Sequence, residues 1–324
     1  MSTAPTSEPG RTQHEPAAAS APTVAHRVQY AAILVVVALL RTLGFARASA
    51  VGGWLGRLAR WPFGVRRRVV ERHLRAVFPE WSEAQILRTS REAYDSIGRT
   101  FVQAAVLPGA SPETVRSLVT EVEGWDILEA AVAHGKGVIL VTGHLGNWEL
   151  GGAYLSARGV PTGAIYRGME NPLFDAYVAR GRAQLGAELI RDLVAARRVP
   201  RALGAGYVIA FLSDQDALGL ASTFAPFFGR PARTPRGAGV FALRLRTPVV
   251  FASCTRLPNG TYRFAIEEVP VHDTGDREAD IDRVVLSCNQ ALERHIRRAP
   301  GQYFWHHRRW KRQPPETPVH LREP

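Results

Sequence analysis

Cysteine is scarce in this sequence, with Cys254 and Cys288 as the only two among 324 residues. Two thiols cannot build a disulfide scaffold, and they supply too few thiolates for a zinc or iron–sulfur site made of cysteines. The sequence also contains neither a Walker A motif nor a Gly-x-Gly-x-x-Gly motif, so nucleotide-phosphate and dinucleotide binding lose support. A Gly-x-Ser-x-Gly elbow is missing as well, so the chain offers no serine nucleophile of that kind.

Low-complexity composition is confined to the start of the chain. Hydrophobic residues make up 46% of the sequence, as in a globular protein that can bury one large core or two modest ones. Residues 1–25 are mostly Ala, Pro, Ser, Thr and Glu without apolar periodicity, and we expect a disordered tail there. We also expect a flexible tail at 314–324, which leaves 47–313 as the folded body.

Acidic residues are outnumbered: 29 Asp plus Glu face 41 Lys plus Arg, a net charge of +12. The excess is concentrated in 41–75, with a net charge of +8, and in 292–313, with +6. Two basic patches on a near-neutral body indicate an anionic partner surface, either phospholipid headgroups or nucleic acid. The alternative is a solvated basic face without a partner.

One long apolar run, Tyr30–Leu40, stands out and continues past Arg41 to Ala46. A helix over 30–46 would be about 25 Å long, slightly short of a hydrocarbon core of ~30 Å. It would either span the bilayer with Arg41 reaching the headgroups or lie in the interface. We therefore assign 28–46 as a membrane anchor, with a buried core helix as the alternative.

A cleaved signal peptide is the other interpretation of this region, because Ala48-Ser49-Ala50 has the form of a cleavage site. The long polar segment in front of the run and the arginines at 41 and 47 argue against it. Positive charge after the run also favours a cytoplasmic location for the residues that follow. We expect an uncleaved anchor in the inner membrane with a cytoplasmic body.

The rest of the chain alternates between strand-like and helical patterns, which predicts an α/β fold with a mostly parallel central sheet flanked by helices. We expect strands at Val119–Val122, Gly137–Thr142, Thr162–Tyr166, Tyr207–Leu212, Pro248–Ser253 and Tyr262–Glu267. We expect helices within 63–78, from Ser82 to about Leu107, from Ser111, and near 124–133, 147–157, 173–185, 192–203, 236–245 and 276–298.

His144 follows an apolar strand in a glycine-flanked turn, and Glu149 comes five residues later. Positions five apart lie about 140° apart on one helix, so a helix that starts within the turn is needed to bring Glu149 back onto His144. Glu149 would then hold one imidazole nitrogen while the other acts as a general base at the carboxyl edge of the sheet. The alternative is a loop histidine with a capping glutamate.

The segment Gly143-His144-Leu145-Gly146-Asn147-Trp148-Glu149 resembles the His-x4-Asp/Glu box of the lysophospholipid acyltransferase superfamily. Its Gly-Asn-Trp-Glu form is similar to that of the late lipid A acyltransferases of Gram-negative bacteria. Further blocks follow in the family's order, namely Tyr166-Arg167 with Asn171-Pro172 and Asp175, Ser213–Asp216 with Phe224–Pro235, and Pro300–Lys311. The match runs from about Tyr30 to Gln313.

The resemblance implies acyl transfer from an acyl thioester to a glycolipid hydroxyl at the cytoplasmic face of the inner membrane. It implies no cofactor and no metal, and the donor is either acyl-carrier protein or acyl-CoA. His144 and Glu149 would be catalytic, and the residues expected to bind substrate are Asn147, Arg167, Asp214, Gln215, Asp216 and Arg309.

Several roles within this resemblance have competing interpretations. Arg167 would meet either the acceptor's phosphate or the thioester oxygen, and the alternative is a surface arginine. Asp214 and Asp216 would position Arg167 or the acceptor, or serve a turn. Trp305 and Trp310, with the basic cluster 308–311, suit an interfacial belt, and the alternative is core aromatics.

Two departures from the family pattern leave the acceptor open: His73-Leu74 stands where Asn-Leu is usual, and Gln103 lies near a position that is often acidic. The leading acceptor is a lipid A precursor, and the alternative is a phosphatidylinositol mannoside-like glycolipid. A different class of function, a non-enzymatic membrane-associated binding protein, would use the basic patches alone. A nucleic-acid platform would interleave aromatic with basic residues, and this sequence does so mainly near 303–310. Because that support is thin, we expect no nucleic-acid partner.

Overall fold

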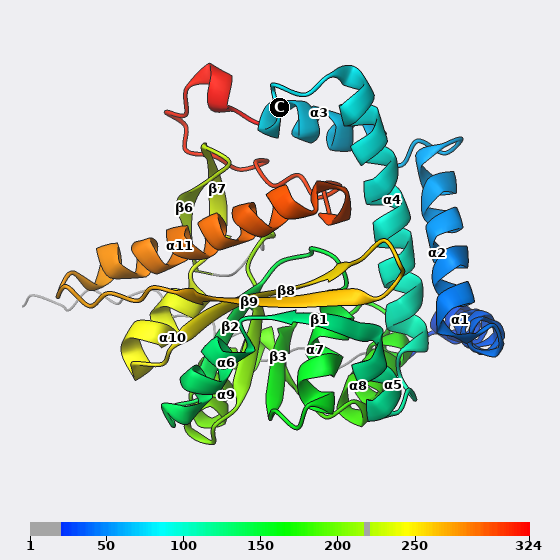
Figure 1. Ribbon diagram of the computed structural model, residues 1–324, viewed down its shortest axis with the longest axis horizontal. Coiled ribbons are helices and arrows are strands. Elements are labelled where there is room, and N and C mark those ends of the chain that lie inside the picture. The colour runs from blue at the N-terminus through cyan, green and yellow to red at the C-terminus, as the bar shows by residue number, and fades with distance from the viewer. Residues whose placement is uncertain (1–20, 217–220) are drawn as a thin grey trace, which may run out of the picture.

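The computed structural model describes residues 21–216 and 221–324. Its centre is a seven-stranded sheet with the strand order β1-β9-β8-β2-β5-β3-β4 (Figure 1). Neighbouring strands are parallel except for β8 and β9, which form an antiparallel pair. The strands are β1 (Val119–Glu123), β2 (Val138–Thr142), β3 (Thr162–Tyr166), β4 (Ala187–Arg191), β5 (Val208–Leu212), β8 (Val249–Arg256) and β9 (Tyr262–Val269). The predicted α/β class with a mostly parallel sheet is confirmed.

Helices cover both faces of this sheet. Long helix α11 lies along one face, and α6 and α7 cover the other (Figure 1). Strand β2 is consequently a continuous apolar run with Val138, Ile139 and Val141 all buried, as expected for a parallel strand covered on both sides. The helices are α1 (Val24–Thr42), α2 (Gly44–Arg60), α3 (Arg67–Val77), α4 (Glu83–Val106), α5 (Pro112–Leu118), α6 (Trp125–Ala133), α7 (Trp148–Ala157), α8 (Pro172–Gln184), α9 (Ala195–Gly204), α10 (Gly237–Leu245) and α11 (Arg277–Arg298).

Four elements escaped the sequence analysis: strand β4, the two strands of a hairpin, and helix α2. Strand β4 is an edge strand with Ile190 as its one fully buried side chain, so it lacks the apolar run that marked the other strands. The hairpin of β6 (Ser222–Phe227) and β7 (Arg230–Pro235) contains Pro226, Pro231 and Pro235, which are unusual within strands. Helix α2 follows α1 so closely that the sequence suggested a single apolar segment.

The N-terminal helix begins earlier and ends earlier than the predicted anchor at 28–46. Thr23 caps α1, its side chain accepting from the backbone of His26, and the helix ends at Thr42. The chain then turns at Gly44, whose φ of +75° lies in the left-handed region. Of the predicted disordered tail at 1–25, residues 1–20 lie outside the described residues. Helix α1 is the one described helix that is long and apolar enough to cross a membrane.

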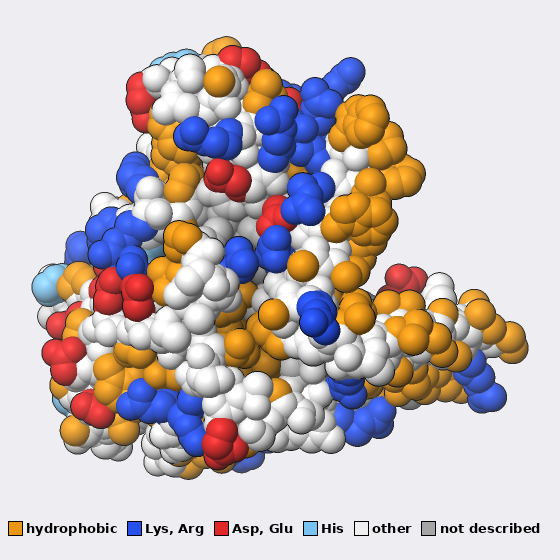
Figure 2. All heavy atoms as spheres, turned by 45° about the vertical axis from the view of Figure 1, so that its right-hand side comes forward, with side chains coloured by type: hydrophobic (Ala, Val, Ile, Leu, Met, Phe, Trp, Pro, Cys, Tyr) orange, Lys and Arg blue, Asp and Glu red, His pale blue; other side chains and the backbone are white. Residues whose placement is uncertain are grey.

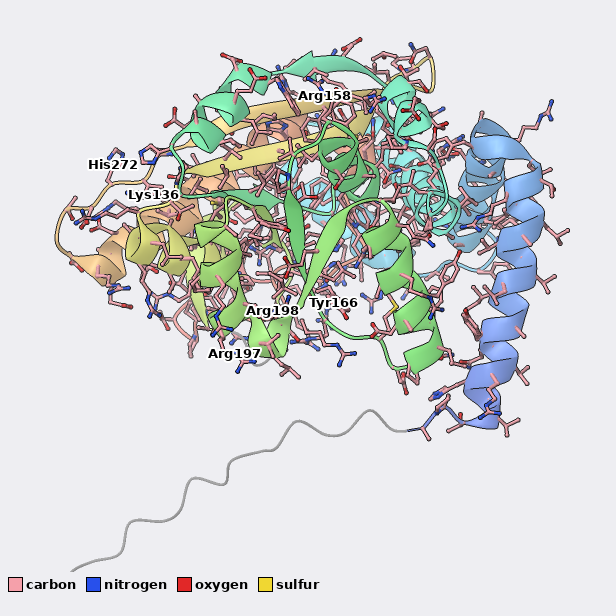
Figure 3. All side chains as sticks on the ribbon, turned by 90° about the horizontal axis from the view of Figure 1, so that it is seen from below. Lys136, Arg158, Tyr166, Arg197, Arg198 and His272 are labelled. Atoms are coloured by element: carbon pink, nitrogen blue, oxygen red, sulfur yellow. The ribbon has the colours of Figure 1, made fainter. Side chains whose placement is uncertain are left out.

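Helices α1 and α2 lie at a steep angle to one another. Figure 1 looks nearly along α1, and Figure 3 shows the same helix lengthwise beside α8. The Asn171 amide at the start of α8 donates to the backbone oxygen of His26, 3.1 Å away. Helix α2 packs instead on α4, where Gly52 and Gly56 allow close approach to the backbone around Gly98. The two helices therefore meet different parts of the body.

The C-terminal region packs into the fold. Trp305 and Trp310 are each 1% exposed and belong to the main core, so the predicted interfacial belt is wrong and the core alternative holds. Residues 314–324, expected to be flexible, contact the β6–β7 hairpin through Arg230, whose guanidinium donates to the backbone oxygens of His320 and Arg322.

The basic patch predicted at 292–313 is largely neutralised within the fold. Arg309 is buried, and ion pairs engage Arg294, Arg297, Arg298, Arg308 and Arg312. In the other basic window, 41–75, Arg57, Arg60, Arg67 and Arg75 are paired with carboxylates. The positive charge that remains available to a partner is therefore smaller than the sequence alone suggests.

Candidate active site

Four adjacent strands end at one edge of the sheet and deliver polar residues there. Strand β2 leads to His144, β5 to Asp214, β3 to Arg167 and β4 to Asp192. These strands are parallel and consecutive in the sheet, so their carboxyl ends meet. The expectation that His144, Arg167 and Asp214 share one sheet edge is confirmed.

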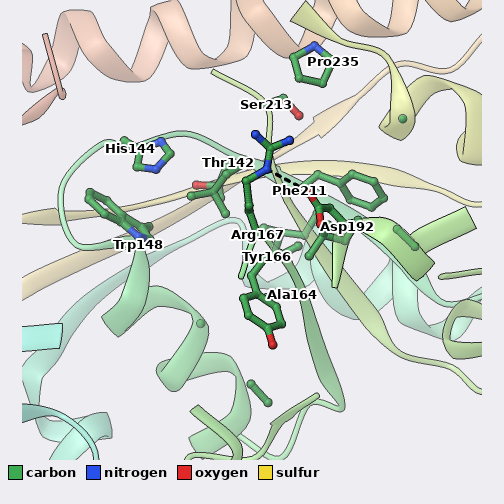
Figure 4. A pocket seen from close by; sticks show the side chains of 18 of the residues that line it. Thr142, His144, Trp148, Ala164, Tyr166, Arg167, Asp192, Phe211, Ser213 and Pro235 are labelled. Carbon is green, nitrogen blue, oxygen red and sulfur yellow. Dashed lines mark hydrogen bonds and ion pairs between the residues drawn. The ribbon is translucent and has the colours of Figure 1, made fainter. Parts of the chain in front are cut away.

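A cavity of about 700 Å³ opens at this edge. Figure 4 shows His144 and Trp148 on one side of it and Arg167 and Asp192 on the other. Most of its wall is apolar, contributed by α7, α10 and the strands beneath them. Its apolar lining includes Leu140, Ala153, Leu155, Ala164, Leu185, Ala210, Phe211, Val240, Phe241 and Phe264. This is the character of a site for an apolar ligand with a few polar groups at its mouth.

Asp214 holds His144 by two contacts. The imidazole Nδ1 lies 2.7 Å from Oδ1 of Asp214, and the backbone N–H of His144 donates to Oδ2 at 2.9 Å. The ring packs edge-on against Trp148, with the ring centroids 4.7 Å apart. Because Nδ1 has one hydrogen to give, this geometry leaves Nε2 of His144 as the nitrogen for the cavity. The Gln215 amide nitrogen lies 3.3 Å from Nδ1 and also lines the cavity.

Burial and charge act together on this pair. Burial of the imidazole is the largest single effect and opposes its protonation, but the charge of Asp214, its hydrogen bond and the charge of Glu149 together raise the pKa of His144 above its usual value. Asp214 is 2% exposed. Burial alone would raise its pKa, but the charge of the protonated His144 and two hydrogen bonds from that residue hold the pKa of Asp214 below its usual value. The two shifts agree, and both favour the ion pair.

Glu149 does not hold His144, so that prediction is wrong. Its carboxylate forms a two-pronged ion pair with Arg182 of α8, with Arg182 Nε donating to Oε2 at 3.0 Å and a second contact beside it. Asn147 caps α7, and the first turn of that helix directs Glu149 toward α8. Glu149 still lines the cavity, and its charge is a smaller influence that raises the pKa of His144. No sequence motif pointed to Arg182.

Arg167 lies at the cavity, as predicted, but its carboxylate partner differs from the prediction. Its Nε donates to Oδ2 of Asp192 at 3.0 Å, and its side chain is 57% exposed (Figure 4). Asp216 is engaged by Arg233 and Arg312, and Asp214 by His144. Asp192 follows the edge strand β4, so recognising that strand in the sequence would have drawn attention to it.

Three predicted substrate-binding residues lie outside the cavity lining, and one of them is Asp214, the partner of His144. Asn147 is 1% exposed, with its Oδ1 accepting from Leu150 N and its Nδ2 donating to Gln103. Arg309 is buried as well, and its guanidinium donates to the backbone oxygen of Arg233 at 2.6 Å. Burial with these bonds makes both residues supports of the site, which corrects their predicted role. Gln103, noted in the sequence as a departure, is the partner that holds Asn147.

Within residues 21–216 and 221–324, no group of three or more His, Cys, Asp or Glu side chains is placed to hold a metal ion. The polar groups that line the cavity are imidazole, carboxylate, amide and guanidinium groups.

Comparison with known proteins gives one consistent family. Residues 19–312 match the family model described as bacterial lipid A biosynthesis acyltransferase. The chain is 30% identical over 274 residues to the lipid A biosynthesis palmitoleoyltransferase of Escherichia coli K12, covering 82% of this chain and 85% of that protein. It is 28% identical over 271 residues to the lauroyltransferase of the same strain, covering 83% and 86%. A phosphatidylinositol mannoside acyltransferase of Mycobacterium tuberculosis is 28% identical over 167 residues, covering 49% and 52%.

Proposed function

The chain belongs to the bacterial lipid A biosynthesis acyltransferase family and is therefore an acyltransferase, and from that premise we propose that it moves a fatty acyl chain from an acyl thioester to a hydroxyl of a lipid A precursor. The observation that carries the proposal is the His144–Asp214 pair at the mouth of a largely apolar cavity. An alcohol is a poor nucleophile at its own pKa, so acyl transfer needs a positioned base of this kind.

The proposed step is direct attack. The acceptor hydroxyl gives its proton to Nε2 of His144 as its oxygen bonds to the thioester carbonyl carbon, while Asp214 keeps Nδ1 as the protonated nitrogen. The tetrahedral intermediate then collapses, the carbon–sulfur bond breaks, and the departing sulfur receives the proton from His144. No acyl-enzyme is formed, and the imidazole returns to its neutral state.

The developing negative charge on the carbonyl oxygen needs a donor near His144. The amide of Gln215 is a side-chain donor beside His144 in the cavity lining, and the guanidinium of Arg167 stands at the mouth, oriented by Asp192. We assign charge stabilisation or acceptor-phosphate binding to Arg167. Glu149, braced by Arg182, would contact the acceptor and favour the charged imidazole from a greater distance.

The apolar wall of the cavity fits the fatty acyl chain of the donor. A cavity lined by aliphatic and aromatic side chains excludes water and favours a fatty acyl chain by the ordinary hydrophobic effect. The thioester head would then lie at the polar mouth beside His144. The donor's carrier is either acyl-carrier protein or coenzyme A.

The N-terminal helices support the proposal of membrane attachment. Helix α1 has 19 residues, a length of about 28 Å, and meets the length and composition expected of a span. The α2 region adds exposed Trp54, Leu55, Trp61 and Phe63, and apolar side chains run along this side of the molecule in Figure 2. We propose that α1 inserts in the inner membrane, that these side chains lie at headgroup depth, and that the body is cytoplasmic.

Among acceptors, the lipid A precursor is favoured over the alternative glycolipid. The two Escherichia coli relatives named for lipid A biosynthesis align over 82% and 83% of this chain, whereas the phosphatidylinositol mannoside enzyme aligns over 49%. Family membership also argues against a non-enzymatic binding protein.

The deciding experiment supplies the detergent-solubilised protein with acyl-carrier-protein and acyl-CoA donors and with both glycolipid acceptors. Products are identified by mass. Transfer to the lipid A precursor, abolished by His144→Ala, supports the proposal. Transfer to the mannoside alone moves the protein to the alternative, and transfer to neither overturns both.

A further inference from the structure

A second cavity of about 700 Å³ lies behind the loop at 143–147 that carries His144, which we call the catalytic loop. It shares no lining residue with the cavity at His144. Helix α4, the end of α11, the turn between β8 and β9, and the short helix η2 (Pro300–Gln302) form its walls. The site lies on the side of the molecule that carries α2, since Arg57 of that helix also lines it. Nothing in the proposed acyl transfer uses this cavity.

The lining is unusually rich in guanidinium groups. Two carboxylates, Glu92 and Asp95, stand in the wall against six arginines, namely Arg57, Arg91, Arg99, Arg256, Arg263 and Arg298. Figure 2 views this side of the molecule, where basic side chains border a hollow next to the apolar column of α2. So many like charges around one concave space call for a counter-charge.

Internal ion pairs supply only part of that counter-charge. Asp95 is shared between Arg57 and Arg99. Glu123, outside the wall, is likewise shared between Arg263 and Arg298, and Glu121 contacts Arg263 again.

Two of the six arginines stand apart from these pairs. Among the residues that the structure describes, Arg91 and Arg256 form no ion pair. The backbone of Arg256 is fixed by Gln302, which accepts from its N–H at 2.7 Å and donates to its oxygen at 2.8 Å. The cavity therefore combines fixed walls with positive charge left over for a ligand.

We propose that this cavity binds a phosphate group on a lipid headgroup, carried either by the glycolipid acceptor or by a neighbouring phospholipid. Planar guanidinium groups match phosphate oxygens in pairs, and several of them can share one phosphate. The apolar surface of α2, with exposed Trp54 about one turn before Arg57, gives lipid tails a place beside the charged hollow. A concave site also suits a headgroup better than the convex surface of an acidic protein.

Occupancy of this cavity would brace the loop that carries His144. Gly146 N donates to Gln302 O at 2.9 Å, and Asn147 N donates to Cys254 O at 2.7 Å, two residues before Arg256. Phe304 N also donates to the backbone oxygen of His144 at 3.0 Å. A phosphate that ties Arg256 to Arg91 would hold both walls against the catalytic loop.

The first test measures binding directly, with inorganic pyrophosphate as the probe and full-length protein in neutral detergent. The variant is Arg91→Gln/Arg256→Gln, and the matched control is Arg244→Gln, an exposed arginine of α10 far from the cavity. Isothermal titration calorimetry should show saturable binding by wild type and by the control. The double variant should bind at least about tenfold more weakly, since each lost charge-assisted contact costs roughly that much. Equal affinity in the double variant overturns the proposal.

The second test separates the two sources of phosphate. If the phospholipid is the ligand, adding phosphatidylglycerol to phosphatidylcholine vesicles should increase binding of wild type and the control but not of the double variant. If the acceptor is the ligand, the double variant should raise KM for the phosphorylated acceptor and leave KM for the dephosphorylated one unchanged. If neither measurement responds to the double variant, the assignment to a lipid is overturned. The assignment is also overturned if an acidic carrier protein binds in a way that depends on Arg91 and Arg256 and pyrophosphate does not compete with it.

The acceptor arm rests on the proposed function, and the other two measurements do not. Wild-type protein that transfers no acyl group but binds pyrophosphate and anionic vesicles through Arg91 and Arg256 would contradict the proposed function while supporting this site.

Discussion

Nδ1 of His144 lies 2.7 Å from Oδ1 of Asp214, a residue seventy positions later in the chain. A base must be neutral to accept a proton, so transfer should fall as pH decreases through the pKa of His144, which Asp214 raises. Asp214→Asn removes that charge and should shift the acidic limb of the kcat/KM profile to lower pH. It should also lower the maximal rate on the order of 10²–10⁴-fold, because the imidazole loses its orientation. The measurement is a pH–rate profile for both proteins.

Glu149→Gln is the comparison for this prediction. Glu149 pairs with Arg182 and acts on His144 only through charge at a distance, so its loss should move the acidic limb less than Asp214→Asn does. An unchanged profile in Asp214→Asn together with a large shift in Glu149→Gln would return the orienting role to Glu149.

His144→Ala should abolish most turnover, by about 10²–10⁴-fold, since it removes the general base. The side chain sits at the cavity and is not part of the main cores, so the variant should unfold near the wild-type temperature. Transfer rates and thermal unfolding curves in the same detergent check both statements. Near-wild-type transfer by His144→Ala would contradict the proposed mechanism.

Local sequence patterns predicted most of the fold. What they missed depends on how segments that are distant in the sequence pack together. Apolar runs such as those of β2 and β5 mark buried strands without further information. The edge strand β4, with Ile190 as its one buried side chain, carries too little hydrophobic signal.

The same limit applies to the catalytic pair. Spacing within the chain pointed to Glu149, whereas the partner of His144 depends on β5 lying next to β2 in the sheet. Strand order is set by packing of the whole domain, so no local pattern reports it. The cavity position of Arg167 was predictable because a strand end alone fixes it.

Deletion of residues 1–42, which removes α1, should reduce flotation of the protein with anionic liposomes. Binding through α2 should remain and should weaken as salt rises, because roughly 1 kcal/mol per arginine near an anionic surface is screened over a Debye length. Adding Trp61→Ser and Phe63→Ser, which are 69% and 73% exposed in the native fold, should lower it further. Salt-insensitive flotation of the truncated protein would place the attachment elsewhere.

Gly56→Ala should destabilise the fold by about 1–3 kcal/mol, because the added Cβ would lie 1.9 Å from the backbone oxygen of Tyr94 where α2 meets α4. Gly204→Ala at the end of α9 is the control, since its Cβ would meet nothing within 4 Å. Thermal unfolding should show a lower midpoint for the first variant and an unchanged or slightly higher one for the second. Equal midpoints would mean that α2 separates from α4 at little cost.

The Nε of Arg167 is held by Asp192 at the cavity mouth. A cation that only binds the acceptor phosphate contributes equally to ground and transition states, so Arg167→Ala would raise KM and leave kcat intact. A cation aimed at the thioester oxygen acts on developing charge, and its loss would lower kcat by roughly 10²–10³-fold.

Lysine at position 167 tests the geometry of that contact, because it keeps the charge but loses the planar fork. We expect Arg167→Lys to be nearly as damaged as Arg167→Ala, since the strand end and Asp192 fix a two-pronged guanidinium rather than a point charge. Asp192→Asn should then reproduce part of the defect by releasing the guanidinium from its orientation. Steady-state kinetics of the three variants provide the measurement, and wild-type kcat and KM in both Arg167 variants would make this arginine a surface residue.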